Sequence, residues 1–147
     1  MNDPSALAAA AAPVARLHGD CWRIADDGVV ELIGSRCTAC GTVYLPQSIT
    51  CARCGGRTFT ALTLAPAGTL YSYSIVHRSG GVWPDLYAVG YVDFPEGVRV
   101  FGQLRADAPA ALAVGARAGL EAATLYRRKD GAAVTCFRFV VAKQERT

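Results

Sequence analysis

The chain has 147 residues, of which 52% are hydrophobic and 18% are charged, and its formal net charge at pH 7 is +3. This length and composition suit one folded domain, or one domain with a small appendage, and they exclude wholesale disorder. No run of 18 consecutive apolar residues occurs, so the sequence predicts no membrane-spanning helix and no membrane partner. The positive charge is too small to indicate a nucleic-acid-binding protein on its own.

The chain starts with an Ala-rich segment, residues 1–18, that contains Asp3 and Pro13. A secretory signal has a basic start and a bulkier apolar centre, and this segment has neither. We therefore expect a short helix or a disordered leader, in a cytoplasmic protein whose thiols stay reduced.

The next segment, residues 19–28, ends in Gly28 after two aspartates, which is a typical helix stop. The sequence predicts a short helix over residues 19–28 that carries Trp22 and Ile24. A short strand over residues 29–33 should then lead into the first cysteine motif.

Four of the six cysteines form two CxxCG motifs, with ten residues between the second cysteine of the first motif and the first cysteine of the second. The four are Cys37, Cys40, Cys51 and Cys54. Each CxxC turn directs two sulfurs at one ion, so the two motifs supply the closed tetrahedral set of a structural zinc site. We expect Zn²⁺ within a zinc ribbon over residues 29–59; iron in a rubredoxin-like electron carrier would suit the same ligands. Four thiolates holding one Zn²⁺ would subtract two charges from the formal value and leave about +1.

The two remaining cysteines do not belong to a recognisable catalytic motif. Cys136 lies in an apolar, strand-like run and Cys21 precedes Trp22, so both are interpreted as buried, inert thiols. A nucleophilic cysteine needs a nearby base, and the chain offers only His18 and His77. The sequence therefore predicts no catalytic residues.

From residue 58 onward, apolar runs of strand length alternate with turn residues. The expected strands are 58–64, 68–77, 86–94, 98–105, 118–128 and 132–142. Asp130-Gly131 is the strongest hairpin signal in the chain. Five to six strands in this length, with alternating faces, predict a small closed barrel.

Two aromatic stripes lie on the expected strands. They are formed by Tyr71, Tyr73 and Ile75 on one strand and by Phe137, Phe139 and Val141 on the last. We interpret both as barrel core; a stacking platform for nucleic-acid bases is the alternative, but such platforms are normally interleaved with Lys and Arg.

These motifs, in this order, resemble a family of small proteins that accompany thiolases and related acyl-CoA enzymes. The resemblance covers residues 19–142. It rests on the two CxxCG motifs, on Tyr44-Leu45-Pro46 before the second motif, and on three runs in the barrel. Those runs are Gly68-Thr69-Leu70-Tyr71-Ser72, Tyr87-Ala88-Val89-Gly90-Tyr91-Val92 and Val114-Gly115-Ala116. One departure is that Pro84 lies three residues before Tyr87 rather than next to it.

The resemblance implies a mainly β protein with an N-terminal helix, a rubredoxin-like zinc ribbon and a C-terminal, five- to six-stranded OB-fold barrel. We place the leader at residues 1–18, the helix and ribbon at 19–59 and the OB-fold at 60–147. The implied function is that of a non-catalytic, zinc-containing subunit of a thiolase-type acyl-CoA complex in a degradative pathway. Its partner would be a thiolase-fold enzyme in a hetero-oligomer. The alternative is a zinc-ribbon and OB-fold module that binds nucleic acid, which the low charge disfavours.

The subunit hypothesis includes acyl-CoA as a ligand shared with the partner. No acidic residue lies between residues 34 and 64, where Arg36, Arg53 and Arg57 surround the cysteines. These arginines either neutralise the thiolate cluster or bind the CoA phosphates, with Arg78 as a weaker candidate for the second role. The apolar residues Val43, Tyr44, Leu45 and Ile49 between the motifs should either dock onto the partner or pack onto the barrel.

Overall fold

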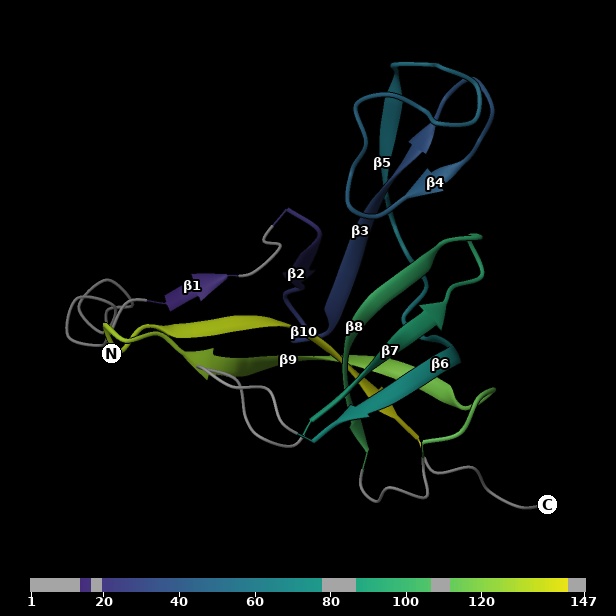
Figure 1. Ribbon diagram of the computed structural model, residues 1–147. Helices are drawn as coiled ribbons and strands as arrows, with labels where there is room; N and C mark the ends of the chain where they lie inside the picture. Colours follow the sequence, from purple (N-terminus) through teal and green to yellow (C-terminus); the bar gives the residue numbers. More distant parts are fainter. Residues whose placement is uncertain (1–13, 17–19, 78–86, 107–111, 143–147) are drawn as a thin grey trace.

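The computed structural model describes residues 14–16, 20–77, 87–106 and 112–142, and it shows a narrow ribbon of strands that stands on a β-barrel (Figure 1). These described ranges hold strands and turns but no helix, which confirms a mainly β fold. They accordingly include no helix that is long and apolar enough to cross a membrane. Most of the expected leader lies outside the described residues. The expectation of a helix or disorder is wrong for residues 14–16, because they form β1 (Val14–Arg16), which pairs in parallel with β10 (Ala133–Val141).

The barrel is built from the five strands that follow the ribbon. They are β6 (Gly68–Val76), β7 (Tyr87–Asp93), β8 (Arg99–Ala106), β9 (Arg117–Arg127) and β10 (Ala133–Val141). β6, β7 and β8 form an antiparallel meander, β10 pairs in parallel with β8, and β9 pairs antiparallel with β10. A short pairing of β6 with β9 at Gly68 and Thr69 closes the barrel, as an OB-fold requires.

The strands expected from residue 58 onward are confirmed, and each of their bounds agrees within one residue. The Asp130-Gly131 hairpin is confirmed as well. The Gly131 amide donates to the Arg128 carbonyl at 2.9 Å, and an Asp130 carboxylate oxygen accepts from the Ala132 amide at 2.9 Å. Alternating apolar residues and turn chemistry were sufficient signals for this half of the chain.

The ribbon is organised around one long strand, β3 (Val30–Cys37). The first residues of β3 pair with β2 (Trp22–Ile24), and its last residues lie between β4 (Val43–Tyr44) and β5 (Phe59–Thr63). In Figure 1, β3 runs from the side of the barrel to the far end of the ribbon, so one strand links the two parts.

The helix expected over residues 19–28 is wrong, because the described residues 20–28 form β2 and a turn. Trp22 is only 2% exposed and pairs with Leu32 across the hairpin. The turn closes when the Gly28 amide donates to the Ala25 carbonyl at 2.8 Å, with φ of 85° at Gly28. A glycine with positive φ ends a helix or turns a hairpin equally well, so the same signal fitted both structures. Burial of Trp22 decided between them.

The base of the ribbon shares one hydrophobic core with the barrel. Trp22, Leu32 and Val43 of the ribbon belong to the same buried cluster as Leu70 and Phe139 of the barrel. Leu45 also packs against this cluster, so the apolar segment between the cysteine motifs packs largely onto the chain itself. Ile49, at 88% exposed, is the member of that segment that remains on the surface.

The two aromatic stripes differ in their burial. Phe137, Phe139 and Val141 are buried, as expected, but Tyr71, Tyr73 and Ile75 are exposed, and their interpretation as core is wrong. An irregularity in the pairing of β6 with β7 falls between Leu70 and Ser72, and it sets Tyr71 out of register with the rest of β6. Such a bulge breaks the simple alternation of faces on which the interpretation depended.

Tyr73 and Ile75 are exposed for another reason. Tyr73 pairs with Gly90, which pairs with Gly102, and a Cβ on Gly102 would lie 2.9 Å from the ring of Phe139. Tyr73 therefore has the register of the inner face. Within the described residues, however, β9 pairs with β6 only at Gly68 and Thr69, so the rest of β6 is an uncovered edge.

The two kinds of aromatic position predict different mutational costs. Phe139→Ala should lower the free energy of unfolding by about 3–5 kcal/mol, because it opens a cavity in the centre of the core. Phe101→Ala, on an exposed position of β8, should change it by less than about 1 kcal/mol. Urea titrations of both variants measure this, and equal losses would contradict the burial assigned to the two rings.

Candidate metal centre

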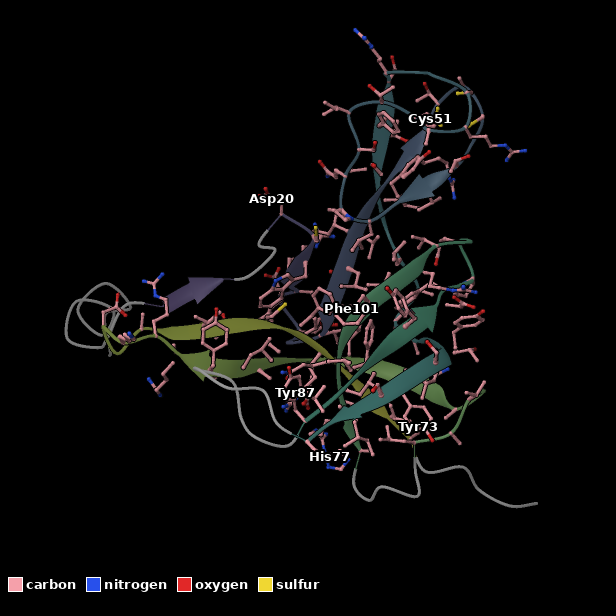
Figure 2. All side chains as sticks on the ribbon, in the orientation of Figure 1. Asp20, Cys51, Tyr73, His77, Tyr87 and Phe101 are labelled. Carbon is pink, nitrogen blue, oxygen red and sulfur yellow. The ribbon has the colours of Figure 1, made fainter. Side chains whose placement is uncertain are left out.

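The two CxxCG motifs form matching turns at the far end of the ribbon, where Figure 2 shows Cys51. In the first turn the Gly41 amide donates to the Cys37 carbonyl, and in the second the Gly55 amide donates to the Cys51 carbonyl, each at 2.8 Å. Both glycines have positive φ, 82° and 79°, a region that residues with a Cβ rarely adopt. The glycine of each motif therefore closes the turn that aims its cysteines.

The four sulfurs that these turns present converge on one point. All four Sγ atoms lie within 4.8 Å of one another, and the Cys37–Cys54 and Cys40–Cys51 pairs are each 3.5 Å apart. Four sulfurs at about 2.3 Å from a tetrahedral zinc ion would be about 3.8 Å apart, so the cluster has the size of a metal site. The predicted ligand set of Cys37, Cys40, Cys51 and Cys54 is thus brought together by the fold.

The ring of Tyr44 supports the second motif from the neighbouring strand. Its hydroxyl accepts from the Ala52 amide at 2.9 Å and lies 3.3 Å from Cys51 Sγ, to which it can donate. This hydrogen bond is the main reason that the pKa of Cys51 falls to about 6. From the sequence, Tyr44 is predicted only as one of several apolar residues between the motifs. Its hydrogen bond to Cys51 was not predicted, because the hydroxyl reaches the sulfur only after β4 is formed.

The pKa of Cys54 changes in the opposite direction to that of Cys51, because the sulfurs are crowded together. The Gly56 amide lowers the pKa of this thiol, but interactions with the Cys37 and Cys40 sulfurs outweigh it and raise the pKa to about 12. Four adjacent thiolates repel one another, so a divalent cation at their centre is what would allow all four to ionise. The chemistry of the donor set therefore fits a metal ion as well as the geometry does.

Gly56 is a second residue whose role the sequence did not reveal. A Cβ at this position would lie 3.2 Å from Cys37 Sγ and 3.3 Å from Cys54 Sγ. Any larger residue would press on two of the four ligands, so the cluster needs glycine here for space rather than for a turn.

The arginines predicted to bind CoA phosphates are only partly placed by the structure. Arg36 lies on β3, and Arg53 and Arg57 lie in and just after the second motif; all three side chains are exposed. None of the three forms an ion pair with a carboxylate in the described parts of the chain. Arg78 lies outside the described residues. The three arginines thus remain available to an anion, and their role stays a prediction.

The other two cysteines lie away from the metal centre. Cys136 is buried in β10, and Cys21 is buried just before β2. Burial, together with the charge of Asp20, raises the pKa of Cys21, which keeps it as a thiol at neutral pH. His77 is exposed at the end of β6, and His18 lies outside the described residues.

Comparison with known proteins gives consistent matches over both parts of the chain. Residues 26–60 match the rubredoxin-like zinc ribbon domain of ChsH2, and residues 62–122 match the C-terminal OB-fold domain of ChsH2. The chain is 32% identical to benzoylsuccinyl-CoA thiolase subunit BbsA of Thauera aromatica over 117 residues, which are 78% of this chain and 79% of that protein.

Two further relatives agree with these matches. A DUF35 domain-containing scaffold protein of Methanocaldococcus jannaschii is 33% identical over 105 residues, which are 68% of this chain and 72% of that protein. Among solved structures, the Ltp2-ChsH2(DUF35) aldolase superposes with a TM-score of 0.59 at 27% identity, covering 74% of this chain and 84% of that one.

The contact between Tyr44 and Cys51 can be tested by metal retention. Tyr44→Phe removes the hydroxyl while keeping the ring, so it should speed the transfer of Zn²⁺ to a competing chelator by about tenfold, the low end of the usual effect of such partners. The control is Tyr73→Phe, an exposed tyrosine on β6. Equal transfer rates for both variants, measured with a colorimetric chelator at pH 7, would show that the hydroxyl does not support the cluster.

Proposed function

The chain belongs to the family of ChsH2-like proteins that join a rubredoxin-like zinc ribbon to an OB-fold, and we propose that it is a non-catalytic subunit of a thiolase-type acyl-CoA complex. The observation that carries the proposal is its similarity, over more than three quarters of both chains, to a protein named as a thiolase subunit. We further propose that it supports the catalytic subunit and helps to bind a 3-oxoacyl-CoA or CoA in a degradative pathway for aromatic, steroid or fatty acyl groups.

The metal site supports a structural role within this function. Cys37, Cys40, Cys51 and Cys54 would hold Zn²⁺, which supplies no open coordination position and therefore a fixed shape rather than a reactive centre. The residues around it aim the ligands: Tyr44 hydrogen-bonds Cys51, and Gly56 leaves room for two sulfurs. The ribbon that results is a rigid arm with three exposed arginines near its end.

The experiment for the complex is co-elution with a catalytic subunit. The probes are the recombinant thiolase-fold enzymes of the organism that encodes this chain, each mixed with it at micromolar concentration and analysed by size-exclusion chromatography. A shared peak with a fixed stoichiometry is the expected result. Separate elution of the chain from every one of these enzymes would overturn the subunit proposal, and binding of a 20-nucleotide single strand of DNA instead would favour the nucleic-acid-binding alternative.

The arginines provide a test of CoA binding by the complex. Phosphate contacts from Arg53 and Arg57 would be charge-assisted, so Arg53→Ala and Arg57→Ala should each raise the KM for acyl-CoA several-fold while leaving bound zinc unchanged. Arg128→Ala is the control, since Arg128 is also exposed but lies at the β9–β10 turn, where it pairs with Asp130. Unchanged KM in both ribbon variants would restrict the arginines to neutralising the thiolates.

A further inference from the structure

A surface of two adjoining parts lies outside the metal centre and outside the predicted CoA residues. Its first part is an aromatic pair on neighbouring barrel strands: Tyr91 of β7 and Phe101 of β8 face each other in register. They are 43% and 54% exposed, and their rings meet edge to face with centroids 5.2 Å apart. Single exposed apolar residues are normal on protein surfaces. Two large aromatic rings in contact with each other on the surface of a sheet instead indicate an interaction site.

The second part is an apolar hollow beside Phe101. It has a volume of about 240 Å³ and lies where the ribbon meets the barrel. Its lining comes from Cys21, Leu45, Pro46, Val100, Phe101 and Phe137. The hollow thus joins residues of the ribbon to residues of β8 and β10, and it is large enough to receive an apolar side chain from another molecule.

The charges on this face are already paired with one another. Arg99 donates two hydrogen bonds to the Asp93 carboxylate, at 2.6 and 3.1 Å, in a two-pronged ion pair. The same guanidinium covers the ring of Tyr71, with its central carbon 3.3 Å from the ring centroid. Asp93, Arg99, Tyr91 and Phe101 are related by the register of β7 and β8, so the neutral pair borders the aromatic pair.

These features distinguish between the two occupants that an OB-fold surface of this kind could take. A nucleic acid needs free cations for its phosphates and free ring faces for its bases. Here Asp93 neutralises Arg99, and Arg99 occupies the face of Tyr71. A protein surface that is neutral and apolar, with one protruding side chain, matches what remains exposed.

We propose that the aromatic pair Tyr91–Phe101 and the adjoining hollow are the docking site for the catalytic, thiolase-type subunit. This inference rests on the proposed function and specifies which surface serves it. Because Leu45 and Pro46 of the ribbon form one wall of the hollow, a subunit seated here would contact the ribbon and the barrel together. The same subunit would then lie beside the arm that carries Arg36, Arg53 and Arg57.

The test measures the affinity of the zinc-loaded, 147-residue chain for a recombinant thiolase-fold enzyme from the same organism. Phe101→Ala and Tyr91→Ala should each weaken binding at least tenfold in isothermal titration calorimetry, since aromatic anchors at an interface centre are typical hot spots. Val114→Ala is the matched control, because Val114 is 65% exposed but lies in the loop before β9. Circular dichroism and urea unfolding confirm that each variant is folded.

The outcomes separate this inference from the function on which it rests. Wild-type affinity in both aromatic variants would overturn the docking site while leaving the subunit function intact. No binding by the wild-type chain would overturn the function and the docking site together. Equal loss in Val114→Ala would show that the binding surface is not the one assigned, and single-stranded DNA binding that Phe101→Ala abolishes would reassign the face to nucleic acid.

Discussion

The convergence of four sulfurs on one ion is the constraint on which the far end of the ribbon depends. The loop that follows Leu45 and leads to the second motif has little apolar packing of its own, since Ile49 is almost fully exposed. Each turn that aims the sulfurs is closed by two backbone hydrogen bonds, which are too few to fix a loop of this length. Metal binding would therefore supply folding free energy for this segment, as in other small metal-held domains.

The base of the ribbon is held in a different way, and this difference has a functional consequence. Trp22, Leu32 and Val43 enter the barrel's own hydrophobic core, so the ribbon cannot pivot on a linker. A metal ion on the four sulfurs would fix the end of the arm, and the core fixes its base. Figure 2 shows the two labelled landmarks of this arrangement, Cys51 at the end of the ribbon and Phe101 on the barrel. A subunit that touches the barrel face would thus find the ribbon arginines at a fixed position.

The parts that the sequence predicted correctly are those with local signals. The cysteine spacing identifies the ligands because each turn is a local structure, and the alternation after residue 58 identifies the strands because each face repeats every second residue. The parts that it missed depend on contacts between distant residues. Trp22 makes a hairpin because Leu32 and the barrel core bury it, and Tyr44 meets Cys51 only across a folded turn.

Tyr71 shows why local alternation has limits. One irregularity in the pairing of β6 with β7 transfers this ring to the side of Arg99, while Tyr73 keeps the register of Gly90 and Gly102. The sequence does not predict the bulge, because Leu70, Tyr71 and Ser72 are all compatible with a regular strand. The surface proposed as a docking site became visible only when the register was known.

Amide hydrogen exchange, measured with and without a chelator that removes the metal, tests most directly the claim that metal and core hold separate parts of the molecule. We predict that removal of the metal strips protection from the amides of Gly41, Cys51 and Gly55, which close the cysteine turns. The amides of β7, β8 and β10 should stay protected. Unchanged protection in the cysteine turns, or loss of protection throughout the barrel strands, would contradict that claim.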